Sequence, residues 1–177
     1  MTLEEYLEIQ PFIKHFCMHF DLLIRRYERF KEIDDPHNTD IDVITYLDMI
    51  IVQLRAMCIE SFNPNNNYTA QNLLRKVGKQ DLADRIDAML NETFYAGRDY
   101  TIREALKKLA DKLICHYDNF DGEHEFDLAV SDILMNNLRN PYEDKNLKYI
   151  MDVLTSCVYE GLYTKFFNEE ETNETTI

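Results

Sequence analysis

The segment from Asp40 to about Phe62 constrains the fold most, because it is long and apolar and contains neither glycine nor proline. Its apolar residues recur every three or four positions, which predicts an α-helix. They form one wide stripe made of Val43, Ile44, Leu47, Ile50, Ile51, Leu54, Met57 and Cys58. A stripe of this width is covered only when two or more helices pack against it. We therefore expect this helix at the centre of a helical bundle.

The rest of the chain has the same character. Its 177 residues include only four glycines and four prolines, and the long stretches without either favour helix throughout. Further helices are predicted at 2–33, from Thr69 to before Gly78, from a cap at Asp81 to about 90, at 101–118, around 131–138 and from 140 to about 167. The sequence thus predicts an all-α, single-domain bundle of about five to seven helices over 1–167. The acidic, Thr- and Asn-rich residues 168–177 are predicted to be a disordered tail.

Local signals define two of the predicted helix starts. Thr101 with Glu104 three residues later forms the pattern of a capping box. Asn140 followed by Pro141 has the pattern of a cap and a first helical residue. In the last helix Gly161 lies on the apolar stripe, where it allows a close approach of another helix. Residues 91–100 are expected to be an irregular entry to the helix that begins after Thr101.

The charge balance indicates which partners suit the chain. Lys and Arg total 19 against 33 Asp and Glu, so the formal net charge is −14. A nucleic-acid-binding protein usually gains affinity from a basic surface, so direct nucleic-acid binding is disfavoured, although a local basic patch is compatible with this composition. A protein partner, in particular a basic one, fits the acidic surface better.

No apolar run approaches the roughly 20 residues of a membrane span, and the acidic start lacks the basic residues of a secretion signal. We expect a cytoplasmic protein without membrane contact. The four cysteines are scattered and form no Cys-x-x-Cys pair, which favours small buried side chains over a zinc or redox site. His15 and His19 are four residues apart and can share a helix face, but no third ligand completes a metal site. No metal and no cofactor are therefore predicted.

The segment from Thr101 to Asp118 carries the strongest functional signal. Ile102, Leu106, Leu109 and Leu113 recur at helical spacing, and His116 falls close to the centre of this apolar stripe. Without further information, a histidine on an apolar helix face is most often a structural residue that donates a hydrogen bond to a neighbouring helix.

Residues 110–118, Ala-Asp-Lys-Leu-Ile-Cys-His-Tyr-Asp, resemble the signature segment of the HEPN superfamily, in the branch linked to abortive phage infection. The resemblance implies a helical bundle, a homodimer and, in many members, an RNA-cutting toxin. The family motif is an arginine followed after four to six residues by a histidine on the same helix. In this chain His116 matches the histidine, Asp111 matches the polar residue after the arginine, and Ala110 stands where the arginine is expected.

If the chain were a nuclease, the resemblance would give His116, Lys112 and Asp111 the catalytic positions. An imidazole can move a proton near neutral pH, and a fixed cation can stabilise charge on a phosphate. Lys112 lies one turn before His116, but a lysine lacks the planar fork of an arginine. A basic residue from elsewhere, such as Arg55 or Arg98, could replace the missing arginine. Arg103 lies too far along and around the helix to do so.

Three functional interpretations follow. The preferred one is a catalytically degenerate HEPN-like protein that acts through protein–protein interaction, in phage defence or a toxin–antitoxin setting. The second is a metal-independent HEPN ribonuclease that uses His116 with a non-standard basic partner. The third is a helical bundle that binds a small ligand or nucleotide, although the chain has no Gly-rich phosphate loop.

Overall fold

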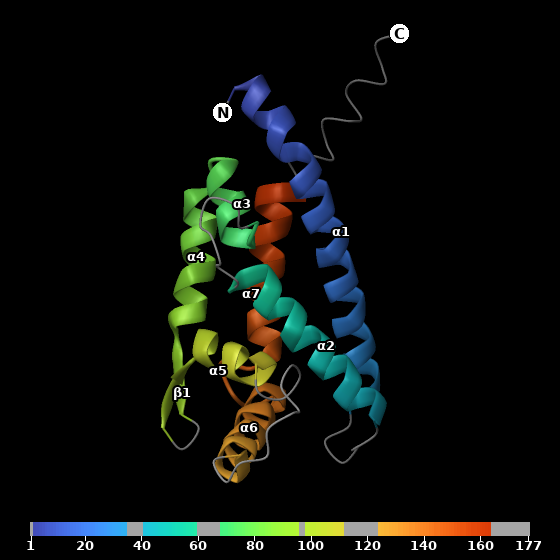
Figure 1. Ribbon diagram of the computed structural model, residues 1–177, viewed down its shortest axis with the longest axis vertical. Helices are drawn as coiled ribbons and strands as arrows, with labels where there is room; N and C mark the ends of the chain where they lie inside the picture. Colours follow the sequence, from blue (N-terminus) through green and yellow to red (C-terminus); the bar gives the residue numbers. More distant parts are fainter. Residues whose placement is uncertain (1, 35–40, 60–67, 96–97, 112–123, 164–177) are drawn as a thin grey trace.

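The computed structural model describes residues 2–34, 41–59, 68–95, 98–111 and 124–163. Within them the chain forms seven α-helices and one small two-stranded sheet, which confirms the predicted all-α bundle (Figure 1). The helices are α1 Leu3–Ile33, α2 Ile41–Cys58, α3 Ala70–Lys76, α4 Gln80–Asn91, α5 Ile102–Leu109, α6 His124–Arg139 and α7 Leu147–Val158. None of these helices combines the length and apolar character needed to cross a bilayer. The predicted tail at 168–177 lies outside the described residues.

Helix α1 is the long helix expected at the amino end. Thr2 and Glu5 close a capping box at its start, and the helix continues through Pro11 without a break. Seven of its buried residues alternate in spacing between four and three, the pattern by which one helix packs along another. They are Ile9, Ile13, Phe16, Phe20, Leu23, Tyr27 and Phe30, and Cys17 is buried beside them. They pack against α2 and against Tyr159–Tyr163, the π-helical turn that follows α7.

Helix α2 crosses the bundle obliquely, as a central helix should, and contacts α1, α3 and α5 (Figure 1). Most of the predicted stripe is fully buried, but Ile44 is exposed because it lies on the outer side of the helix. The buried side chain of Gln53 joins α2 to α1. Its Nε2 donates to the carbonyl oxygen of His19 at 2.5 Å, and its Oε1 accepts from Arg26 at 2.6 Å.

Helices α3 and α4 form a short helical hairpin. Thr69 precedes α3 as expected, and Gly78 ends it with φ +79°, a conformation that favours glycine. The predicted cap at Asp81 was wrong. Lys79 holds the cap position of α4 without a side-chain hydrogen bond, and Asp81 instead lies in the first turn, where its charge suits the helix dipole.

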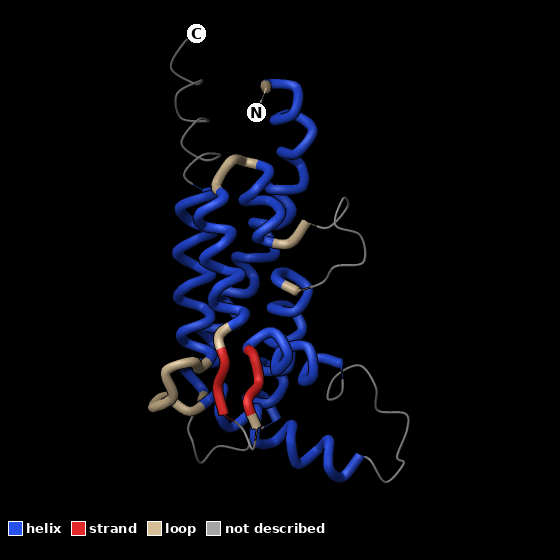
Figure 2. Tube along the Cα trace, turned by 90° about the vertical axis from the view of Figure 1, so that its left-hand side faces the viewer, coloured by secondary structure: helices blue, strands red, loops and turns tan. Residues whose placement is uncertain are grey.

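Residues between α4 and α5 form an unpredicted β-hairpin rather than an irregular entry. Strands β1 Thr93–Tyr95 and β2 Asp99–Thr101 pair antiparallel, with Phe94 opposite Tyr100. Figure 2 shows the two strands side by side at one end of the bundle. Strands of three residues are too short to give an alternating pattern that sequence reasoning can detect. The hairpin leads directly into α5, because Thr101 both ends β2 and caps the helix.

The last two helices differ from the prediction in their boundaries. Helix α6 begins at His124, earlier than the apolar pattern indicated. The predicted start of the final helix at Asn140 was wrong: the oxygen of the Asn140 side chain accepts from the Tyr142 amide in a turn, and Asn146 caps α7. Gly161 has the predicted role, since a Cβ atom there would lie 2.1 Å from Cδ2 of Leu74. The described helices share one continuous apolar core.

Candidate functional site

The signature segment begins as predicted. Thr101 Oγ1 accepts from the Glu104 amide at 3.1 Å, and Glu104 Oε2 accepts from the Thr101 amide at 2.9 Å. Because the Glu104 carboxylate accepts hydrogen bonds from Thr101, which stabilise its charged form, the pKa of Glu104 is lowered. The inner face of α5 is fully buried, and the helix widens into a π-helical turn at Ala110 and Asp111.

Of the three candidate catalytic residues, the structure describes only Asp111. His116 and Lys112 lie outside the described residues. Ala110, which stands at the position of the motif arginine, is fully buried in the core. A long cationic side chain at this position would have to be buried or would displace the neighbouring helices.

An arginine nevertheless reaches this end of α5 from another helix. Arg55 of α2 forms an ion pair with Asp111, with 2.7 Å between the guanidinium nitrogen and the carboxylate oxygen. The two side chains are 24% and 31% exposed, so the pair lies at the edge of the core and remains in contact with solvent. Of the two arginines considered as substitutes, the structure brings Arg55 to the signature helix. Arg98 instead lies over the ring of Tyr100, 4.4 Å from its centre.

A second polar cluster fixes the beginning of α5 to α3 and α4. Asp87 accepts from Arg75 at 2.5 Å and from Arg103 at 3.1 Å. The buried amide of Gln71 donates to Asp87 at 3.2 Å and to the carbonyl oxygen of Cys58 at 2.9 Å. Arg103 is therefore committed to a structural ion pair, in agreement with its exclusion as a substitute for the motif arginine.

A separate feature runs along the outer side of α1, which we call the α1 groove. It consists of four adjoining hollows that share lining residues. Eleven residues of α1 line it, namely Glu5, Glu8, Ile9, Phe12, His15, Phe16, His19, Leu22, Arg25, Arg26 and Arg29. The opposite wall is formed by α2 along most of the length, and by Tyr68 and the end of α3 at the amino end of α1. Sequence reasoning missed this groove, although the residues of its wall repeat at helical spacing.

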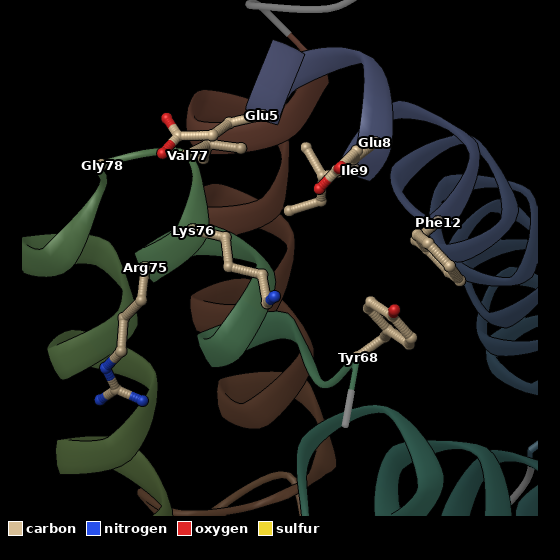
Figure 3. A pocket seen from close by; sticks show the side chains of 9 residues that line it. All are labelled: Glu5, Glu8, Ile9, Phe12, Tyr68, Arg75, Lys76, Val77 and Gly78. Atoms are coloured by element: carbon tan, nitrogen blue, oxygen red, sulfur yellow. The ribbon is translucent and has the colours of Figure 1, made fainter. Parts of the chain in front are cut away.

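At the amino end of α1, the groove lies between α1 and the end of α3 (Figure 3). The rings of Phe12 and Tyr68 are stacked there, with 4.0 Å between centres and 8° between planes. Figure 3 shows Lys76 pointing into the space below Glu8, whereas Arg75 points away from it toward α4. The stacked rings separate this polar end from the middle of the groove.

The middle of the groove contains His15 and His19, whose rings lie 4.5 Å apart. Beyond them the floor is apolar and is formed mainly by Leu22, Met49 and Val52. Leu22 and Met49 are 41% and 44% exposed, which is unusually open for large apolar side chains that face each other across two helices.

The last section of the groove is basic. Three arginines of α1, Arg25, Arg26 and Arg29, line it together with Asp42 of α2, and Arg29 is already paired with Glu32 at 2.8 Å. Asp48 lies half-buried in the adjoining section, and burial raises its pKa because the charged carboxylate loses hydration. In a chain of net charge −14, this section is a local basic patch.

No other feature of the described residues indicates catalysis. They contain no group of three or more His, Cys, Asp or Glu side chains that could hold a metal ion. Burial raises the pKa of the Cys17 and Cys58 thiols to about 12, so both stay protonated at neutral pH and are poor nucleophiles. Comparison with known proteins gives no relative: no family model, no curated protein and no solved structure matches the chain.

Proposed function

We propose that this chain is a HEPN-like helical protein that has lost catalysis and acts by binding another protein, in phage defence or a toxin–antitoxin setting. The observation that carries the proposal is the α1 groove, an open channel whose middle part is apolar and lies between α1 and α2. Large exposed apolar side chains such as Leu22 and Met49, gathered in one channel, are typical of interaction surfaces. The homodimer implied by the resemblance belongs to the same proposal.

The environment of Ala110 supports the loss of catalysis. Position 110 is a fully buried alanine, so it offers no guanidinium to a phosphate, and Arg103 of the same helix is paired with Asp87. The carboxylate of Asp111 next to it is already paired with Arg55. An ion pair of this kind reduces the positive charge that the end of α5 presents to an RNA backbone.

The Arg55–Asp111 pair also favours a second function. A ribonuclease that works without a metal would need a cation near the signature histidine, and Arg55 is the arginine that contacts this segment. In this alternative, Arg55 would leave Asp111 when RNA binds and stabilise charge on the phosphate, while His116 would transfer the proton.

A ribonuclease assay separates the two functions. Purified wild-type protein and His116→Ala would be incubated with total tRNA and rRNA in the presence of a chelator. We expect no cleavage by either protein. Cleavage by the wild type that is lost in both His116→Ala and Arg55→Ala would contradict the proposal and support the alternative, provided that Arg98→Ala, the matched control, remains active.

A capture experiment tests the binding function directly. The full chain would be used as bait in extracts of its source cell, and bound proteins would be identified by mass spectrometry. We expect at least one protein to be retained in a stoichiometric complex after nuclease treatment. Retention of RNA alone, or of no macromolecule, would contradict the proposed function.

A further inference from the structure

We propose that the α1 groove receives an amphipathic α-helix of the partner protein, with carboxylates on the part of that helix that meets Arg25 and Arg26. This inference rests on the proposed function, because it names the kind of partner that the interaction surface fits. Three properties of the groove support it: the spacing of the α1 residues, the apolar floor and the arginines at one end.

The spacing of the groove wall matches a helix. Seven of the eleven α1 residues that line it alternate in spacing between four and three: Glu8, Phe12, His15, His19, Leu22, Arg26 and Arg29. This is the repeat by which one helix accepts the side chains of another along its length. The same repeat, shifted by one residue, forms the buried stripe of α1 from Ile9 to Phe30. Helix α1 therefore carries two adjacent helix-packing stripes, of which the core covers one.

The length and depth of the groove are also those of a helix site. From Glu8 to Arg29, the wall extends about 30 Å at 1.5 Å per residue. Over its middle part α2 supplies the second wall, so that a third helix would lie in the valley between two helices. Its apolar residues would contact Leu22, Met49 and Val52, as in the general helix-in-groove mode of recognition.

The arginines of the groove determine which end of the partner helix carries carboxylates. Arg25 is exposed and has no hydrogen-bond or ion-pair partner within the described residues, so its charge is available to a ligand. Arg26 is held toward the groove by its hydrogen bond to Gln53, which is itself fixed by the carbonyl oxygen of His19. A guanidinium positioned in advance loses less side-chain entropy when it binds a carboxylate.

The alternative ligand for an arginine cluster is a nucleic acid. The floor beside the arginines is apolar, and Asp42 and Asp48 stand on the facing wall. A phosphate backbone is charged along its whole length, so it would lie against both carboxylates and gain nothing from the apolar floor, whereas a helix can carry its carboxylates only where the arginines lie. A helix with leucine-like residues along one face and carboxylates at one end satisfies both parts of the groove.

Designed peptides provide the first test. Two fluorescent helical peptides of about 20 residues would share a leucine seam and differ only at one end, which carries flanking glutamates in one and lysines in the other. We expect the glutamate peptide to bind the full chain more tightly than the lysine peptide, by about tenfold in anisotropy titrations at low salt. Equal binding of the two peptides, or binding of neither, would overturn the inference.

Matched variants then locate the binding site. Met49→Asp should weaken binding of the glutamate peptide by at least about tenfold, whereas Ile133→Asp on α6, with the same 44% exposure, should not. Arg25→Glu should weaken it by about fivefold, whereas Lys107→Glu on α5, an equal change in net charge, should not. An unchanged affinity in Met49→Asp would place the peptide elsewhere and overturn the inference.

Site-specific photo-crosslinking in the source cell distinguishes this inference from the proposed function. A photoreactive residue at position 49 should crosslink to a partner segment with helical apolar spacing and acidic residues, and the same residue at position 133 should not. A partner captured by the intact chain but never crosslinked from position 49 would overturn the inference and leave the proposed function standing. Crosslinks from position 49 to nucleic acid, or to this chain itself, would also overturn it.

Discussion

The end of α5 and the α1 groove differ in how the fold uses their polar and apolar groups. At the end of α5, the sequence carries a recognisable signature, yet Ala110 is buried and Asp111 is paired with Arg55. Along the α1 groove, the sequence carries no signature, yet Leu22 and Met49 are open and Arg25 has no partner within the described residues. A familiar motif and an available surface therefore lie in different parts of this molecule.

The difference follows from packing. A side chain is available to a ligand only if it is neither buried in the core nor paired with another side chain. At the end of α5, Ala110 is buried and Asp111 is paired. The groove exists because α1 carries two packing stripes and the bundle covers one of them. The buried alanine and paired aspartate at the end of α5, and the exposed side chains of the α1 groove, can each be tested by substitution.

The largest expected effect comes from restoring the motif arginine. Ala110→Arg would place a long cation in the core beside Leu106 and Leu109, which are also fully buried. We expect the free energy of unfolding to fall by about 3 kcal/mol or more, because the charge is buried without a partner and the core is overpacked. Urea denaturation followed by circular dichroism measures this loss.

The control is Lys107→Arg, which places the same side chain on an exposed position of α5 and should change stability by less than about 0.5 kcal/mol. If Ala110→Arg were as stable as the control, position 110 would be able to hold an arginine. The end of α5 would then be as available to a functional side chain as the α1 groove is, and the contrast between the two regions would fail.

A smaller effect is expected at the Arg55–Asp111 pair. Both side chains keep partial contact with solvent, so their coupling should be about 0.5–1 kcal/mol rather than the larger value of a fully buried pair. A double-mutant cycle with Arg55→Met and Asp111→Asn measures it by thermal unfolding. A coupling near zero would mean that Asp111 does not hold Arg55 in place, as the ribonuclease alternative requires.

The sequence predicted the part of the fold that depends on local patterns. The helical spacing in α1 and α2, the capping box at Thr101 and the close approach at Gly161 were all predicted correctly. Each of these features is determined by residues close together in the chain or by the size of a single side chain. Such features need no knowledge of which helices become neighbours.

The incorrect predictions have the opposite character. Asn140 and Asn146 are both suitable helix caps, and only the packing of Leu147 and Ile150 in the core selects the second. Likewise, the helical spacing of Phe20, Leu23 and Tyr27 predicts the buried Leu23, but nothing in the sequence shows that Leu22 beside it is 41% exposed in a groove. The contact between Arg55 and Asp111 joins helices that are far apart in the chain, so periodicity could not identify it.

The smallest predicted effect concerns Asp48, which lines the apolar section of the α1 groove. Burial raises the pKa of this carboxyl above its unfolded value, so the folded protein retains the proton more strongly than the unfolded chain. The group therefore costs stability as the pH rises from below its unfolded pKa to above its folded pKa, and the cost is complete at neutral pH. Asp48→Asn should increase the free energy of unfolding at pH 7 by about 0.5 kcal/mol and should have little effect near pH 3.

Asp152 provides the control, because it is an exposed aspartate that pairs with Lys148 at 2.5 Å, so Asp152→Asn should not stabilise the protein at pH 7. A gain at Asp48 alone would mean that the groove contains a charge that the folded chain tolerates without a partner. Such a charge lowers the stability of the folded chain. Destabilising groups of this kind are expected in a site that binds another molecule. Equal stability of Asp48→Asn and the wild type at pH 7 would instead mean that water reaches Asp48 freely, and the groove would be shallower than its lining residues indicate.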